Sequence, residues 1–111
     1  MLRTHLLFFS FLSILMISCD ALYTKDDYIQ AFSDFVNESS EKANTYTEED
    51  WKSADKKFDK YINADYQRFK TNLNPLDELA LAELRNAYVY LRVNAKYKKT
   101  KQAQIKHLKN Y

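Results

Sequence analysis

Few residues of this chain have the side-chain chemistry of catalysis or metal binding. It contains one cysteine, Cys19, and two histidines, His5 and His107. His107 stands in a lysine-rich segment far along the chain from any acidic cluster, so neither a Cys-His nor a Ser-His-Asp set is expected, and zinc lacks ligands. The adjacent acids at 48–50 point in different directions around a helix start, so they do not converge on a metal ion. A chain without glycine also has no phosphate-binding loop. We therefore expect a protein that is not an enzyme and that holds no cofactor and no metal.

Residues 1–18 have the form of a signal peptide. A basic head at Arg3 is followed by the apolar run 6–17 and by a small residue at position 18. A transmembrane helix needs about 20 apolar residues, and this run meets Asp20 too soon. The sequence therefore predicts export.

The end of this run resembles a lipidation signal. Met16-Ile17-Ser18-Cys19 is similar to the lipobox of bacterial lipoproteins, in which the cysteine becomes the acylated first residue of the mature protein. The resemblance implies cleavage after Ser18 and a thioether to diacylglycerol on Cys19, and two or more acyl chains anchor a protein stably. A buried or incidental cysteine is the alternative, while a disulfide within the chain is excluded because there is no second cysteine. We predict lipidation of Cys19 and, through it, attachment to a membrane.

The residues after position 18 have a composition typical of helices. They number 93 (111 − 18), include no glycine and one proline, and so disfavour the tight turns of sandwiches and barrels. Thr24, Thr47 and Asn74 each precede an acidic first turn, which is the pattern of a helix N-terminus. We predict helices over about 25–43, 48–72 and 75–95 or beyond.

Apolar residues recur at helical spacing in each segment. The predicted core residues are Tyr28, Phe32, Phe35, Val36 and Ala43; Trp51, Ala54, Phe58, Tyr61, Ile62, Phe69 and Leu73; and Leu76, Ala80, Leu84, Ala87, Tyr88, Leu91 and Ala95. Short linkers between such helices imply antiparallel neighbours. We predict an all-α fold, a small antiparallel three-helix bundle over 25–95. A lipidated linker at 19–24 precedes the bundle. A basic tail at 96–111, a candidate helical extension, follows it. Trp51 either closes one end of the core or serves as an exposed anchor for a partner.

Two groups of residues could bind a partner. Tyr66 and Tyr90 lie outside the predicted apolar stripes and are therefore free to contact a partner. Exposed tyrosines are common in recognition surfaces. Lys98, Lys99 and Lys101 belong to the tail, which contains six lysines and no acid. Residues 19–95, in contrast, have ten basic and fifteen acidic residues and therefore a net charge of −5. We predict a module that docks a protein or a glycan; the alternative is a membrane-surface or polyanion binder that acts through the tail. Nucleic acid is not expected, because arginines and interleaved aromatics are too few in the tail.

A second resemblance, which covers more of the chain, concerns the localisation of the protein. Lys25-Asp26-Asp27-Tyr28 and Tyr46-Thr47-Glu48-Glu49-Asp50-Trp51, followed by Ala54-Asp55 and Phe58, resemble the small envelope lipoproteins of gut Bacteroidota that carry a short helical domain of unknown function. It extends over about residues 19–95. The resemblance implies a lipid-anchored protein of the bacterial cell envelope, preferentially at the outer membrane on its periplasmic or its surface face, and it implies no activity.

Overall fold

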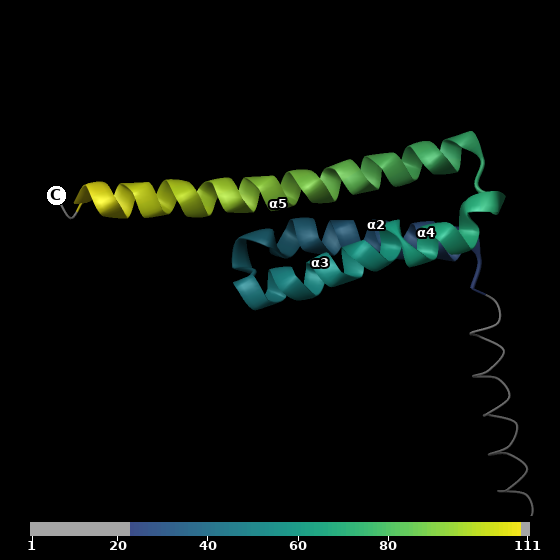
Figure 1. The fold of residues 1–111 in the computed structure, drawn as a ribbon, viewed down its shortest axis with the longest axis horizontal. Coiled ribbons are helices and arrows are strands. Elements are labelled where there is room, and N and C mark those ends of the chain that lie inside the picture. Colours follow the sequence, from purple (N-terminus) through teal and green to yellow (C-terminus); the bar gives the residue numbers. More distant parts are fainter. Residues whose placement is uncertain (1–22, 110–111) are drawn as a thin grey trace, which may run out of the picture.

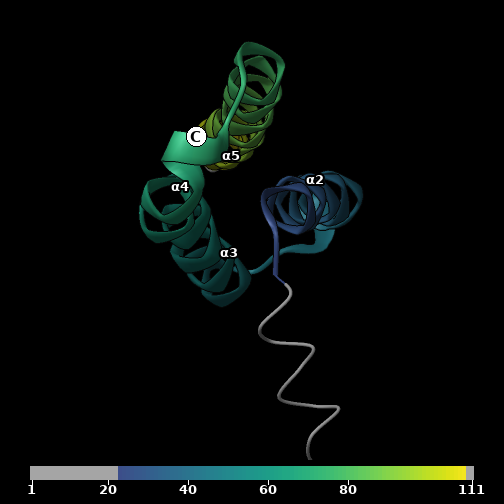
Figure 2. The same cartoon turned by 90° about the vertical axis from the view of Figure 1, so that its right-hand side faces the viewer.

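The computed structural model describes residues 23–109, which form a bundle of antiparallel helical segments (Figures 1 and 2). Its elements are α2 (Lys25–Lys42), η1 (Ala43–Thr45), α3 (Glu48–Ile62), α4 (Ala64–Phe69), η2 (Lys70–Asn72) and α5 (Pro75–Lys109). This part of the chain contains no strand, so the predicted all-α bundle is confirmed. None of its helices combines the length and apolar character needed to cross a membrane. The predicted signal peptide and Cys19 lie outside the described residues.

The helices α2, α3 and α5 begin at the predicted caps Thr24, Thr47 and Asn74. At each of these three starts the side chain of the cap accepts a hydrogen bond from the third helical amide, and an aspartate there accepts one from the backbone of the cap. These reciprocal bonds satisfy backbone donors that a helix N-terminus leaves free, and the carboxylates favour the positive end of the helix dipole. The amide-to-cap distances are 3.3 Å from Asp27 to Thr24, 3.1 Å from Asp50 to Thr47 and 2.8 Å from Asp77 to Asn74.

The core is a continuous series of aromatic contacts between the helices. Within residues 23–109, nine hydrophobic side chains are buried: Tyr28, Phe32, Phe35, Val36, Trp51, Ala54, Phe69, Leu81 and Tyr88. Ring centroids are 5.4 Å apart for Tyr28 and Phe69, 5.0 Å for Phe32 and Tyr61, and 4.3 Å for Phe58 and Tyr88. Burying such rings is the main stabilising contribution in a domain this small, and the predicted stripes of α2 and α3 supply most of them.

The predicted second helix is interrupted at Asn63. Its backbone angles, φ −113° and ψ −81°, depart from helical values and separate α3 from α4. Two contacts stabilise the break: the Asn63 amide group donates to the Asp59 carboxylate at 2.7 Å, and the buried Tyr28 hydroxyl donates to the Tyr61 carbonyl at 2.6 Å. A side chain that bonds into the helical ladder is a common cause of such a kink.

The third helix is longer than its predicted core stripe and partly rotated from it. α5 continues to Lys109, so residues 96–109 are a helical extension of the bundle. Leu76 and Ala87 were expected in the core but are exposed, whereas Leu81 is buried. The reason is that α5 carries two apolar stripes, and only the one that includes Leu81 and Tyr88 faces α2 and α3.

Candidate functional site

A cleft of about 720 Å³ opens where α5 passes η1 and the start of α3. Aromatic residues Tyr46 and Trp51 contribute to its wall. Its charged lining consists of the cations Lys52, Arg92, Lys96, Lys98 and Lys99 and the acid Glu48. Arg92 and Lys99 form ion pairs with Asp55 and Glu48, so the other three lysines give the cleft a net positive charge, which favours negatively charged ligands.

A polar cluster between α3 and α5 supports the inner wall of this cleft. The Arg92 guanidinium forms a forked pair with the Asp55 carboxylate, at 2.9 Å from Nε and 3.0 Å from its terminal nitrogen. Asp55 also accepts a 2.6 Å hydrogen bond from the Tyr88 hydroxyl. Burial, and then this bond to Asp55, raise the pKa of Tyr88. The carboxylate therefore holds two side chains of α5 in fixed positions.

Arg92 also covers the indole of Trp51. Its guanidinium carbon lies 4.7 Å from the centre of the Trp51 ring, within the range of a cation–π contact. Tyr46 also meets Trp51 edge-on, with the ring centroids 4.9 Å apart. Trp51 is only 7 % exposed, so it belongs to the core and is not an exposed anchor.

The local sequence explains why Tyr46 and Trp51 meet. Tyr46 directly precedes the Thr47 cap and Trp51 is the fourth residue of the helix, which are the two positions of a hydrophobic staple. This spacing could have predicted the contact. The pairing of Asp55 with Arg92 has no comparable signal, because 37 residues separate them and only the fold of the bundle joins them.

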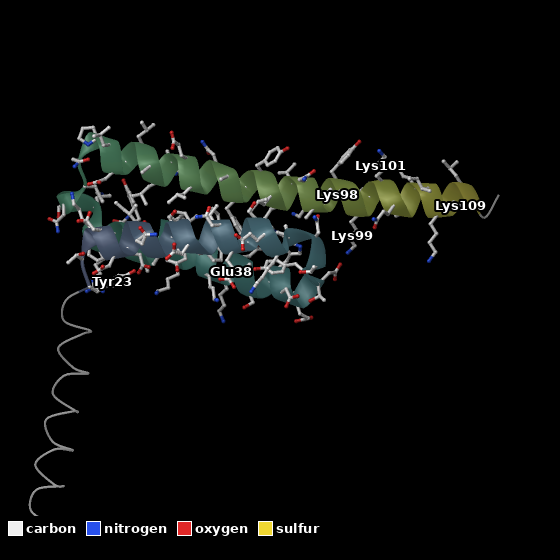
Figure 3. All side chains as sticks on the ribbon, turned by 180° about the vertical axis from the view of Figure 1, so that it is seen from behind. Tyr23, Glu38, Lys98, Lys99, Lys101 and Lys109 are labelled. Atoms are coloured by element: carbon white, nitrogen blue, oxygen red, sulfur yellow. The ribbon has the colours of Figure 1, made fainter. Side chains whose placement is uncertain are left out.

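The five predicted partner-binding residues do not converge on one site. Lys98 donates to the Asn44 side chain at 3.1 Å and Lys99 pairs with Glu48, so both belong to the rim of the cleft. These contacts are exposed and contribute little to stability. Figure 3 places Lys99 on the bundle side of α5 and Lys101 on its outer side.

The two predicted tyrosines lie elsewhere. Tyr66 donates to the Glu78 carboxylate at 3.2 Å beside a hollow of about 210 Å³ between α2, α4 and α5. That hydrogen bond, and then partial desolvation, raise the pKa of Tyr66. Tyr90 is 69 % exposed on the outer side of α5, away from the cleft. The tyrosines therefore do not form an aromatic platform.

Residues 23–109 contain no group of three or more side chains arranged to hold a metal ion. The cleft contains cations, amides and aromatic walls, which can bind and orient an acidic group.

Residues 39–111 match the family model described as Domain of unknown function (DUF6565). The chain belongs to this family. No curated protein and no solved structure matches it. The DUF6565 span begins within α2 and contains every residue that lines the cleft, from Ala43 to Gln102.

Proposed function

We propose that the protein is a non-enzymatic lipoprotein of the bacterial cell envelope, anchored at the outer membrane through acylated Cys19, whose bundle docks an acidic segment of a partner protein. The observation that carries the docking proposal is the cationic cleft and the rigid Asp55, Tyr88 and Arg92 cluster behind it. The position of Cys19 after an apolar run and Ser18 supports the anchor.

The surroundings of Trp51 favour a protein segment over a glycan. A sugar-binding platform presents the face of an aromatic ring to solvent, whereas the Trp51 ring is buried beneath Arg92 and against Tyr46. Lysine side chains and the Asn44 and Asn94 amides remain at the cleft for carboxylates and peptide groups. An acidic peptide matches this combination.

A second candidate function is binding of a membrane surface or polyanion through the basic tail. The observation in its favour is that α5 extends past the rest of the bundle as an exposed helix that includes Lys101, Lys106 and Lys109 (Figure 1). The start of α2, which follows Cys19 in the sequence, and the end of α5 lie at opposite ends of the bundle (Figure 1). If Cys19 is the anchor, the chain enters the bundle at the end opposite to the tail, and this favours the cleft over a tail that binds the membrane surface.

Capture of cross-linked partners from the native envelope, followed by mass spectrometry, tests the proposal with two matched variants. Lys52→Glu/Lys96→Glu reverses two charges at the cleft, and Lys106→Glu/Lys109→Glu reverses two charges on the extension. We expect the cleft variant to lose a protein that the wild type and the extension variant retain, and we expect that protein to have an acidic segment at the cross-link.

Other patterns of capture would point elsewhere. Loss in the extension variant alone, with a steep decline of binding as salt is raised, would support the polyanion candidate. Carbohydrate captured in place of protein would identify a glycan ligand. Equal capture by all three chains would contradict the docking proposal.

A further inference from the structure

The outer side of α5 carries a stripe of exposed apolar residues that runs the length of the helix. Its large members are Leu76, Leu79, Tyr90, Tyr97, Ile105 and Leu108, which are 45–76 % exposed. Singly exposed apolar residues are ordinary, but a row at helical spacing on one helix face is the pattern of a helix that pairs with another. We call this row, together with Glu83, Ala87, Asn94 and Lys101, the outer stripe of α5.

The outer stripe has the same spacing from either end. From Leu76 the steps are 3, 4, 4, 3, 4, 3, 4, 4 and 3 residues to Leu108, and the order is unchanged in reverse. If two such helices lie antiparallel, each member therefore faces another member. The opposed pairs are Leu76 with Leu108, Leu79 with Ile105, Glu83 with Lys101, Ala87 with Tyr97, and Tyr90 with Asn94.

These pairs are complementary in chemistry as well as in position. Leucine meets leucine or isoleucine at both ends, an acid meets a base at Glu83 and Lys101, and the small Ala87 faces the large Tyr97. We propose that two copies of the chain associate through the outer stripe as an antiparallel pair of α5 helices. This interface is distinct from the floor of the cleft, although Asn94 borders both.

The charge distribution along α5 favours this orientation. The first turns contain Asp77, Glu78 and Glu83, whereas residues 96–109 contain six lysines and no acid. An antiparallel partner brings the basic end of each helix beside the acidic end of the other, while a parallel partner brings lysines beside lysines. The charge asymmetry thus identifies a second copy, reversed, as the occupant.

The length of α5 agrees with the same partner. Leu76 and Leu108 are separated by 32 residues, or about 48 Å of helix, which is enough for a long two-helix interface. Residues 100–109 extend past the other helices in Figure 1, yet they include Ile105 and Leu108. In the proposed pair, this extension covers the exposed Leu76 and Leu79 of the other copy.

Charge reversal within the stripe tests the proposal. Glu83 and Lys101 are exposed and form no ion pair within residues 23–109, so their reversal leaves the bundle unchanged. We expect the full chain to be a dimer by sedimentation equilibrium in density-matched non-ionic detergent. Glu83→Lys and Lys101→Glu should each weaken the dimer about tenfold or more, because each variant places two like-charged pairs in the interface.

The double variant is the decisive control. Glu83→Lys/Lys101→Glu restores opposite charges only if position 83 of one copy faces position 101 of the other, so it should recover dimerisation. Lys56→Glu, on the exposed surface of α3, should leave the dimer intact. A monomeric wild type, or single variants that the double variant does not rescue, would overturn the proposal.

Cross-linking in cells gives an independent measurement without detergent. Two differently tagged full chains, one with Glu83→Cys and the other with Lys101→Cys, should form a mixed disulfide when co-expressed and oxidised. Two differently tagged chains that both carry Glu83→Cys should not, because an antiparallel pair keeps these positions far apart. A chain without an introduced cysteine controls for Cys19, and equal cross-linking in both combinations would contradict the orientation.

Discussion

Tyr88→Phe isolates one hydrogen bond of the cluster beside the cleft. Tyr88 is 1 % exposed and its ring stacks on Phe58 at 4.3 Å, so phenylalanine preserves the packing. The change removes only the hydroxyl that donates to Asp55 at 2.6 Å. The free energy of unfolding should therefore report this bond, with little contribution from a cavity.

The magnitude follows from the surroundings of the acceptor. A hydrogen bond to an ionised group contributes about 1.5–3 kcal/mol. The Asp55 side chain is 43 % exposed and keeps Arg92, so water can replace part of the lost bond. We expect a decrease of about 1–2 kcal/mol. Tyr28→Phe is a matched comparison because its hydroxyl donates to the neutral Tyr61 carbonyl, and it should cost about 0.5–1.5 kcal/mol.

Urea melts of the full chain, followed by the emission of Trp51, provide the measurement. A double-mutant cycle of Tyr88→Phe with Asp55→Asn separates the bond from other effects of each change. The two substitutions should be non-additive by about 0.5 kcal/mol or more. Additive effects, or a Tyr88→Phe chain within about 0.3 kcal/mol of wild type, would refute the assignment of a stabilising bond to Asp55.

Four further changes test other parts of the molecule. Trp51→Ala should lower the free energy of unfolding by about 3–5 kcal/mol, measured by circular dichroism, because it leaves a cavity where a buried ring was. An unchanged midpoint would contradict the assignment of Trp51 to the core. Ser39→Ala should raise stability by about 0.5–1 kcal/mol in the same assay, since the buried Ser39 hydroxyl has no hydrogen-bond partner within the described residues. A loss of stability would mean that this hydroxyl does form a hydrogen bond. Burial raises the pKa of Tyr28 and Tyr88, so their stabilisation should be complete below pH 10 and decline as pH rises above it, with phenolate absorbance appearing only on unfolding. Cys19→Ala should abolish labelling by a fatty-acid probe, and an unlabelled wild type would contradict the lipid anchor.

The starts of the helices could be predicted because they depend on neighbouring residues. A threonine cap followed three residues later by aspartate forms its hydrogen bonds within one turn, so the sequence contains the whole interaction. The cores of α2 and α3 were predictable for a similar reason, since each has one apolar side. Burial of Tyr28 and Trp51 confirms those predictions.

The remaining features depend on contacts between distant segments. The break at Asn63 involves the Tyr28 hydroxyl from α2, which no pattern within 48–72 indicates. α5 has two apolar sides, and periodicity alone could not show that Leu81 would be buried and Leu76 exposed. The cleft likewise depends on Arg92 meeting Asp55 across the bundle. The sequence indicated Lys98 and Lys99, two of the four lysines of the cleft, without showing the site that they line.

The family match and the folded core have different boundaries. Similarity begins at residue 39, within α2, yet four of the nine hydrophobic residues that are buried in the described part of the chain precede it: Tyr28, Phe32, Phe35 and Val36. A fragment cut at that boundary would expose the inner sides of α3 and α5 to water and would be open to proteolysis and aggregation. The unit recognised by similarity is therefore smaller than the unit that unfolds cooperatively, and α2 is part of the thermodynamic domain on which the matched segment depends.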